Sequence, residues 1–401
     1  MKKELSSKEA AAILGVSAAT LYAYVSRGLL TSIADGTARS KRYSREDVLR
    51  LAARKADGKR AGHAVAAAMS WGVPVLESRI SLIADGKLYY RGHDSAVLAA
   101  SATLEQTAAI LWGATGAQAA PPPLPMLPPA AAALARGMPP LERAMAFLPV
   151  LAAQPDCRLN GSGAAGDAPG PKAPQEPQGP CASQPAQLMR MLAGLLLGAD
   201  ITDAPLHEQL ARAWKVEAAG MELLRAALVL MADHELNTSA FTVRCVASTG
   251  AALPAVLCAG LAALSGREHG GHYLMAKEVI LAQLDGTAAG ALQPMRPGFG
   301  HPLYPQGDPR ARALLEMMRP LPQAAAVLAV AARAAGTAGA EPNSDFALAA
   351  LELALGLPQH SGIVVFALAR SAGWLAHAAE QVADGGMIRP RARYVGEFGA
   401  A

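Results

Sequence analysis

Aromatic residues and cysteines are scarce in this chain of 401 residues, and each shortage excludes a class of protein. Aromatics make up 4% of the residues while 52% are hydrophobic, so the core must be built mainly from Ala, Leu and Val. That composition favours closely packed helices. The four cysteines include no Cys-x-x-Cys pair, which argues against zinc ribbons and thioredoxin-type redox motifs. We interpret them as unpaired thiols in a reducing compartment.

Long apolar runs and an N-terminal signal core are also lacking. Continuous apolar runs such as Ala324–Ala332 fall short of the ~18 residues that a membrane span needs. The uncharged stretch Cys245–Gly266 is diluted by Ser, Thr, Gly and Pro, so we interpret it as buried core. The chain opens MKKELS, without an apolar signal core. We therefore predict a cytoplasmic protein with no membrane partner.

Positive charge is concentrated near the N-terminus. Residues 1–60 hold 13 Lys/Arg and 6 Asp/Glu, whereas the net charge of the whole chain is only +4. A basic module on a near-neutral body points to a polyanionic partner for that module alone. The alternative is a merely solvated basic face.

The first 62 residues have the pattern of two short helices joined by a turn. Ser6–Glu9 reads as a capping box, Gly15 makes a turn, Ser17 caps a second helix that Gly28 ends, and Ser44 opens another helix. This order resembles the MerR/excisionase-like winged helix-turn-helix family. The resemblance implies DNA binding through the second helix and a basic loop, against the alternative of a module kept for packing or dimer assembly. The candidate DNA-binding residues are Ser17, Thr20, Tyr22, Arg27, Arg39, Lys41 and Arg42.

Stretches rich in Pro, Gly, Ala and Ser interrupt an otherwise helical pattern. Residues 154–187 are predicted to be a low-complexity loop, because they cannot bury enough apolar surface to offset the entropy of ordering. Within it, residues 161–166 match GxGxxG, but no strand precedes them and no helix follows, so we reject a dinucleotide site. Residues 79–91, RISLIADGKLYYR, predict a β-hairpin that turns at residues 84–86.

Four segments of the body concentrate His, Asp and Arg beside glycine. They are ADHELNTS (232–239), GREHGGH (266–272), GFGHPLY (298–304) with DPR at 308–310, and EPNSDF (341–346). Taken singly, His234 could be a core imidazole, His301 a loop residue and Asp345 a helix cap. His269 and His272 lack a third ligand at fixed spacing, so we predict no metal site.

Together these segments resemble the citrate synthase family, from about Trp71 to Gly396 apart from the low-complexity insertions. GFGHPLYPQGDPRA, PNSDF, VVFALARSAGWLAHAAEQ and IRPRARYVG follow in the family's order. The resemblance implies a mainly α, two-domain fold over residues 63–401, with the small domain at about 270–350, after a winged helix-turn-helix domain at 1–62. It also implies a homodimer whose active site lies in the cleft between the large and small domains and is completed by the other subunit.

The activity implied is the condensation of acetyl-CoA, as co-substrate, with oxaloacetate to give citrate and CoA, with no other cofactor. Asp345 would take a methyl proton, His269 would donate to the thioester oxygen, and His301 would protonate the ketone oxygen. Guanidinium groups would hold the dicarboxylate, because bidentate pairing fixes both charge and orientation. Arg389 would come from the partner subunit. The positions matching substrate-binding residues are His234, Arg310, Phe366, Arg370 and Arg389.

The chain departs from the family beside these residues. His272 and Tyr273 stand where the family usually has Ala-Asn, and Pro302 stands where it has Arg. Glu268 replaces an apolar residue, and we expect it to raise the pKa of the neighbouring His269. These changes keep open a second function, a DNA-binding regulator whose synthase-like body senses an acyl-CoA or a dicarboxylate. A 2-methylcitrate synthase using propionyl-CoA and a citryl-CoA lyase are further alternatives.

Overall fold

The chain divides into two compact units, Met1–Glu77 and Ser78–Ala401. The predicted boundary between residues 62 and 63 falls outside the described residues, as do Arg27, Gly28, Arg39 and the GxGxxG motif. The computed structural model describes residues 4–26, 30, 32–34, 41–49, 51, 76–114, 124–153, 183–286, 297–338, 341–392 and 394–396.

The first unit is a helix-turn-helix with a small antiparallel sheet. Its elements are β1 (Glu4–Ser6), α1 (Ser7–Leu14), α2 (Ala18–Ser26), β2 (Ser32–Ala34) and β3 (Lys41–Ser44). Ser6 caps α1 through the predicted capping box with Glu9, and Gly15 ends the helix at φ 60°. The strand order is β1-β3-β2, and residues 45–49 form the predicted helix after Ser44. The buried residues of this unit are Leu5, Ala10, Leu14, Leu21, Leu30, Tyr43 and Val48.

The second unit begins with the predicted hairpin. Strand β4 (Ser81–Ala84) pairs with β5 (Lys87–Tyr90), and β5 pairs with β6 (His93–Asp94). Asp85 and Gly86 both have positive φ, 51° and 70°, as a two-residue type I′ turn requires. The hairpin prediction is confirmed.

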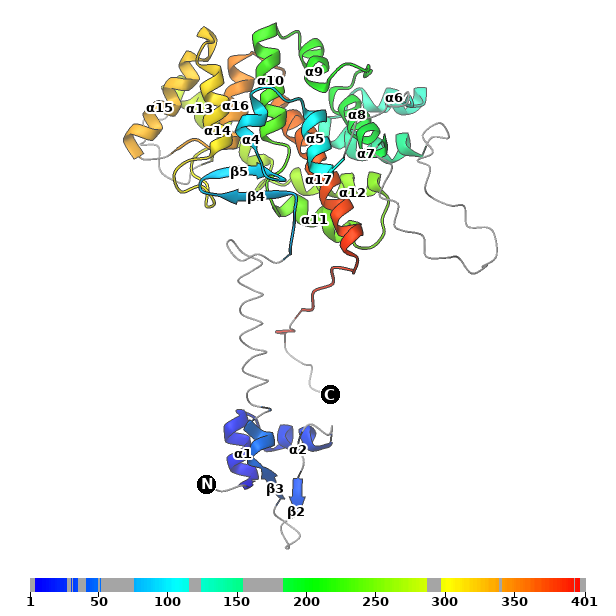
Figure 1. Ribbon diagram of the computed structural model, residues 1–401, viewed down its shortest axis with the longest axis vertical. Helices are drawn as coiled ribbons and strands as arrows, with labels where there is room; N and C mark the ends of the chain where they lie inside the picture. Colours follow the sequence, from blue (N-terminus) through cyan, green and yellow to red (C-terminus); the bar gives the residue numbers. More distant parts are fainter. Residues whose placement is uncertain are drawn as a thin grey trace, which may run out of the picture. The chain divides into compact units, whose positions relative to one another are not determined.

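Helices make up most of the rest of this unit, with α17 running between two groups (Figure 1). One group contains α13 to α16, and the other contains α6 to α9. The helices are α4 (Ser95–Ala99), α5 (Leu104–Trp112), α6 (Pro129–Ala135), α7 (Pro140–Ala152), α8 (Ser183–Leu197), α9 (Leu206–Trp214), α10 (Ala218–Leu230), α11 (Thr238–Ala247), α12 (Leu253–Leu264), α13 (Gly271–Leu284), α14 (Pro309–Met318), α15 (Ala325–Ala338), α16 (Ser344–Ala354) and α17 (Ser361–Asp384).

The low-complexity prediction is wrong at its C-terminal end. Helix α8 begins at Ser183, so residues 183–187 form its first turn. The continuation of the helix buries Leu188, Met191 and Leu192, and Gln187 is buried with them. An apolar face that packs in the core therefore extends the helix back into a polar stretch.

Helix α17 is the central core helix, and the sequence-based survey of apolar runs missed its length. By length and composition it could cross a membrane, but 94% of its most apolar 18-residue window is buried within the protein. Arg370 interrupts the continuous apolar run, yet it is itself only 1% exposed. Gly373 lets the helix approach the α10 end closely: its N–H donates to Ala232 O at 3.1 Å, and an added Cβ would overlap Asp233.

Candidate active site

His234 lies in the turn after α10, which the hairpin and α17 hold in place. The preceding Asp233 is fully buried, accepts a hydrogen bond from Ser81 Oγ at 2.5 Å and lies 3.2 Å from His377 Nε2. The N–H of Ile83 donates to Glu235 on the other side at 3.1 Å. Contacts with β4 and α17 therefore flank His234 and fix the orientation of its backbone.

His269 lies in the turn that leads into α13, and a serine on α11 contacts its ring. Asn237 caps α11, and Ser239 Oγ, in the first turn, lies 2.9 Å from His269 Nε2. Trp374 on α17 donates its indole N–H to the same oxygen at 3.1 Å. The ring of Phe366 meets the imidazole edge-to-face at 5.9 Å between centroids.

His301 is presented by a glycine-rich loop that pairs with the segment before α16. Gly300 N–H donates to Glu341 O at 2.8 Å, and Asn343 N–H donates to Gly298 O at 2.9 Å. His301 Nδ1 accepts from Leu303 N–H at 3.2 Å, so the neutral ring carries its hydrogen on Nε2.

Tyr304 connects this loop to the other imidazole. Its hydroxyl lies 3.0 Å from His234 Nε2, and its ring centroid is 5.0 Å from that of His301. The centroids of His234 and His301 are 5.1 Å apart. The two histidines and the tyrosine therefore form one packed cluster.

Asp345 lies in the first turn of α16. Asn343 caps the helix, and its Oδ1 accepts from the N–H groups of Asp345 and Phe346 at 3.0 and 3.3 Å. The Asp345 side chain is partly exposed, and burial nevertheless raises its pKa to about 6. The positive charges of Arg310 and Arg370 and the imidazole of His272 act on it in the opposite direction, so these groups lie within electrostatic reach of the carboxyl.

Two buried arginines lie against the aromatic rings of the site. Arg310, 2% exposed, pairs in a fork with Asp308, at 3.0 Å to Oδ1 and 2.7 Å to Oδ2, and its guanidinium lies 5.7 Å from the Tyr304 ring centroid. Arg370 donates through Nε to Met231 O at 3.0 Å and stands 4.8 Å over the ring of Phe366. Burial lowers the pKa of Arg370 to about 10, so it stays charged at neutral pH.

All three imidazoles are neutral at physiological pH. Burial, with Arg370 adding to it, lowers the pKa of His269 to about 4. Burial and Arg310 lower the pKa of His301 to about 4, and burial lowers the pKa of His234 well below its usual range. The expectation that Glu268 raises the pKa of His269 is wrong. The Glu268 side chain is 83% exposed and contacts His272 Nε2 at 3.3 Å instead.

The structure brings together seven of the eight predicted site residues. His234, His301 and Arg310 meet at Tyr304, His269 and Arg370 meet at Phe366, and Asp345 is electrostatically coupled to the arginines. Arg389 lies in the exposed segment after α17, away from these contacts within one chain, so its place in the partner's site remains a prediction. Among the described residues, no group of three or more His, Cys, Asp or Glu side chains could hold a metal ion.

Sequence reasoning gave no role to Ser239, Tyr304 or Trp374. Tyr304 contacts His234, Ser239 contacts His269, and Trp374 contacts Ser239. In the sequence Ser239 reads as part of the helix cap after Asn237, and Trp374 stands among apolar helix residues. Tyr304, three residues after His301 in a Gly/Pro loop, was the one with a usable signal, because a polar-tipped aromatic in such a loop needs a partner.

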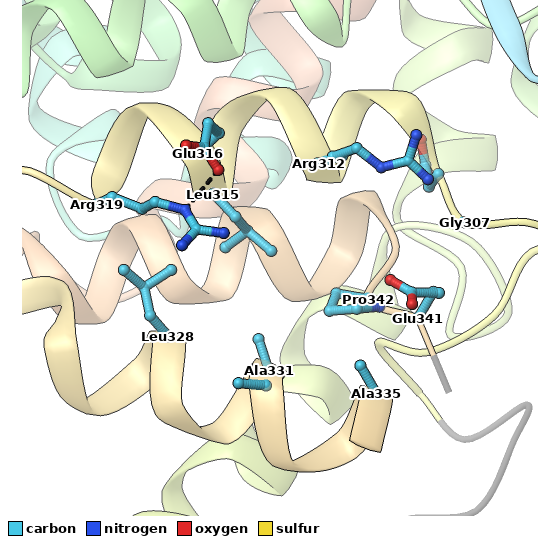
Figure 2. Close-up of a pocket in the computed structure, with 12 residues that line it drawn as sticks. Gly307, Arg312, Leu315, Glu316, Arg319, Leu328, Ala331, Ala335, Glu341 and Pro342 are labelled. Atoms are coloured by element: carbon cyan, nitrogen blue, oxygen red, sulfur yellow. Dashed lines mark hydrogen bonds and ion pairs between the residues drawn. The ribbon is translucent and has the colours of Figure 1, made fainter. Parts of the chain in front are cut away.

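A cavity of about 230 Å³ lies between α14 and α15 (Figure 2). Leu315 and Leu328 face each other across it, and Arg312 and Glu341 stand at one end. Asp308, the partner of Arg310, is one of its lining residues. None of His269, His301 and Asp345 lines it. The cavity is therefore lined by other residues than the three candidate catalytic ones.

The described part of the first unit includes five of the seven candidate DNA-binding residues, namely Ser17, Thr20, Tyr22, Lys41 and Arg42. Ser17 Oγ accepts from Thr20 N–H at 3.2 Å, which confirms Ser17 as the cap of α2. Tyr22 is 48% exposed, and Lys41 Nζ lies 5.6 Å from its ring centroid. Arg42 lies on β3, opposite Ser6 and Ile33 of the flanking strands. Tyr22 on α2 and Lys41 on the sheet thus form one surface.

Comparison with known proteins agrees with both units. The family model of the citrate synthase C-terminal domain matches residues 129–391, and a helix-turn-helix domain model matches residues 4–56. The body thus has the helical architecture and the motif order of that family. The chain belongs to the citrate synthase family.

Among relatives, "Citrate synthase 2" of Bacillus subtilis is 35% identical over 196 residues, which is 44% of this chain and 51% of that protein. The "2-methylcitrate synthase 2" of Corynebacterium glutamicum is 32% identical over 193 residues, 42% of this chain and 48% of that protein. The chain spans about half the length of the curated relatives it matches.

Solved structures establish the fold over more of the chain. Citrate synthase from Pyrobaculum aerophilum has a TM-score of 0.66 at 22% identity, covering 82% of this chain and 92% of that one. The Thermoplasma acidophilum citrate synthase, solved as a ternary complex with carboxymethyl coenzyme A and oxaloacetate, has a TM-score of 0.63 at 21% identity and covers 82% of this chain and 96% of that one. The predicted mainly helical, citrate synthase-like fold is confirmed, while the small domain at about 270–350 stays a prediction.

Proposed function

We propose that the second unit catalyses the condensation of acetyl-CoA with oxaloacetate to citrate and CoA. One observation carries the proposal: three neutral imidazoles, two buried guanidinium groups and a carboxyl of raised pKa occupy one connected region. Neutral donors, fixed cations and a strengthened base are what enolisation and addition to a dicarboxylate require.

Oxaloacetate would be held by charge and orientation together. Arg310 and Arg370 are buried and keep their charge, and Arg389 of the partner subunit would complete the set. His234, locked between Tyr304 and the backbone of its own turn, would fix the ketone end. Pairing of the two oxaloacetate carboxylates with these arginines would orient the ketone carbon toward the thioester.

Asp345 would take the proton from the methyl group of acetyl-CoA. A carboxylate with a pKa of about 6 is mostly ionised at neutral pH and is a stronger base than an ordinary aspartate. The enolate oxygen would be stabilised by His269. Trp374 donates into Ser239 Oγ, which lies 2.9 Å from His269 Nε2, so this contact would hold the imidazole in place beside the thioester. Ser239 Oγ in turn donates to Asn237 Oδ1 at 2.7 Å, and the same Oδ1 accepts from two backbone N–H groups, so the serine is itself fixed at the start of α11.

The enolate carbon would then bond to the ketone carbon. The ketone oxygen takes the proton from Nε2 of His301, the tautomer that the Leu303 hydrogen bond selects. Water cleaves the thioester of citryl-CoA, and citrate and CoA leave. With propionyl-CoA the same steps give 2-methylcitrate, the product named for the Corynebacterium relative. A citryl-CoA lyase would run the carbon–carbon bond formation in reverse, without the hydrolysis step.

The test is release of the CoA thiol by the purified chain from acetyl-CoA and oxaloacetate. Asp345→Asn should reduce kcat by about 10²-fold to 10⁴-fold, the usual contribution of a general base. Glu341→Gln, which removes an exposed carboxylate four residues away, is the matched control and should retain activity. A wild-type protein inactive with both acetyl-CoA and propionyl-CoA would overturn the proposal.

A second function, DNA binding by the first unit, is favoured by the helix-turn-helix match and by the exposed pair of Tyr22 and Lys41. Affinity for a DNA duplex should fall as salt rises, and Lys41→Ala or Arg42→Ala should each reduce the slope of log K against log [salt] by about 1. Lys87→Ala, an exposed lysine of the second unit, should leave the slope unchanged. Binding that is indifferent to salt and to these changes contradicts a DNA-binding role.

A further inference from the structure

Glu352 on α16 is a buried carboxylate that gathers donors from two neighbouring helices, and the proposed mechanism does not use it. It is 2% exposed. From α13, the Tyr273 hydroxyl donates to Oε2, and Lys277 Nζ donates to Oε1 at 2.5 Å. From the start of α17, Ser361 Oγ and Gly362 N–H each donate to Oε2 at 3.0 Å.

The donors keep this carboxylate charged. Burial alone would raise the pKa of Glu352, but the hydrogen bonds from Lys277, Tyr273 and Gly362 hold it below its usual value. A buried charge without partners is costly, so the three helices that supply the carboxylate and its donors are held together while it is ionised.

Two of the three helices bear candidate site residues, and the third begins two residues after one. Asp345 is in the first turn of α16, α17 carries Phe366 and Arg370, and His269 lies in the turn that leads into α13 at Gly271. Tyr273 is four residues after His269, about one helical turn.

The turn that carries His269 is packed tightly onto the start of α17. A Cβ on Gly362 would overlap the Tyr273 ring, and a Cβ on Gly270 would approach Ile363 Cδ1 to 2.7 Å. The apolar contacts thus press the turn against α17, and Glu352 adds directional bonds at the same junction.

We propose that Glu352 is a positioning residue which, through Tyr273 and Lys277, fixes the His269 turn against the helices that bear Asp345, Phe366 and Arg370. Its kinetic consequence rests on the proposed function. An error of about 1 Å in the placement of a reacting group can cost about 100-fold in rate. Displacement of the His269 turn, when bonds to Glu352 are lost, therefore lowers the rate of enolisation. Binding of oxaloacetate is spared, since His234, Arg310 and Arg370 do not depend on α13 for their contacts.

The test variant is Tyr273→Phe, which keeps the ring and removes one of four donors. We expect kcat to fall about 10-fold, the KM for oxaloacetate to stay within about twofold, and the amides of residues 266–272 to exchange faster with deuterium. Tyr89→Phe, which removes a hydroxyl from the hairpin strand β5, is the matched control and should change none of these quantities.

Lys277→Met provides a second test, because Lys277 is partly exposed and its apolar stem is retained. It should give the same pattern as Tyr273→Phe, and it serves if that variant does not fold. Unchanged kcat and unchanged exchange in a folded variant overturn the inference. A wild-type protein that releases no CoA defeats the proposed function, while exchange at residues 266–272 still decides whether Glu352 holds the turn.

Discussion

At the scale of single residues, burial rather than neighbouring charge decides how the site titrates. Desolvation raises the pKa of Asp345 to about 6 although two arginines oppose it, and desolvation lowers the pKa values of His269 and His301 to about 4. The base and the two donors are therefore in complementary protonation states over the same pH range.

A pH profile follows from these values. As the pH falls through 6, Asp345 becomes protonated, so kcat at saturating substrates should decrease, approaching a tenfold loss per pH unit. The imidazoles stay neutral down to about pH 4 and add no further limb above it. The measurement is kcat between pH 4.5 and about 8. A kcat that stays constant from pH 7 down to about pH 5 would contradict the assignment of Asp345 as a base of raised pKa.

The same shift predicts a trade-off between stability and activity. The pKa of Asp345 is higher in the folded state than its ordinary value of 3.8, so its contribution to stability is complete below pH 3.8 and is lost as the pH rises through about 6. At pH 7.5 Asp345→Asn should therefore be more stable than wild type by about 3 kcal/mol, and at pH 4 by less than about 1 kcal/mol. Urea unfolding at both pH values tests this, and an equal difference at the two would refute it.

Residue types and their order were enough to predict which side chains meet, but not their electrostatics. His269, His301, Asp345 and the arginines lie in one region although up to a hundred residues separate them, and the family's motif order carried that information. The prediction for Glu268 failed because adjacency in sequence is not adjacency in space. At the entrance to α13 its side chain faces solvent while His269 faces Ser239.

At the scale of elements, local signals predicted the ends of elements, while burial patterns were needed for the core. The capping box of α1 and the turn of the hairpin each depend on a few adjacent residues and were read correctly. The start of α8 and the extent of α17 depend on what packs against them, which the sequence does not state.

Gly373 shows how closely α17 is packed. A Cβ there would overlap Asp233, so Gly373→Ala should destabilise the second unit by about 3 kcal/mol and displace the His234 turn. Gly336→Ala is the matched control, since this glycine lies in α15 with open space around it and the substitution should stabilise the protein by about 0.5–1 kcal/mol. Thermal unfolding of the two variants measures the contrast, and equal effects would contradict the packing.

At the scale of the whole molecule, the sequence predicted two modules and a dimer, and the structure describes the two units separately. Each has its own buried cluster, one around Tyr43 and one around α17. The completion of the site by a partner chain remains a prediction, because Arg389 lies outside the contacts of its own site.

Mixing two inactive variants tests that arrangement. If Arg389 serves the partner's site, co-expressed Asp345→Asn and Arg389→Ala chains should recover about a quarter of wild-type activity, because half of randomly formed dimers contain one intact site of two. The control is Asp345→Asn mixed with His301→Asn. Because both residues belong to the same chain's cluster, every site in a mixed dimer lacks one of them, and no activity should be recovered. Failure of the first pair to complement would place Arg389 outside the active site.

Helix α17 has a consequence beyond catalysis. It is the middle of the core and it also presents Arg370 and Phe366, so a dicarboxylate bound there would shift the folding equilibrium of the entire unit in favour of the native state. Cellular proteases act on chains that have opened. Under the proposed function, the lifetime of this protein would therefore lengthen when its own metabolite is plentiful and shorten in starvation, without any dedicated degradation signal.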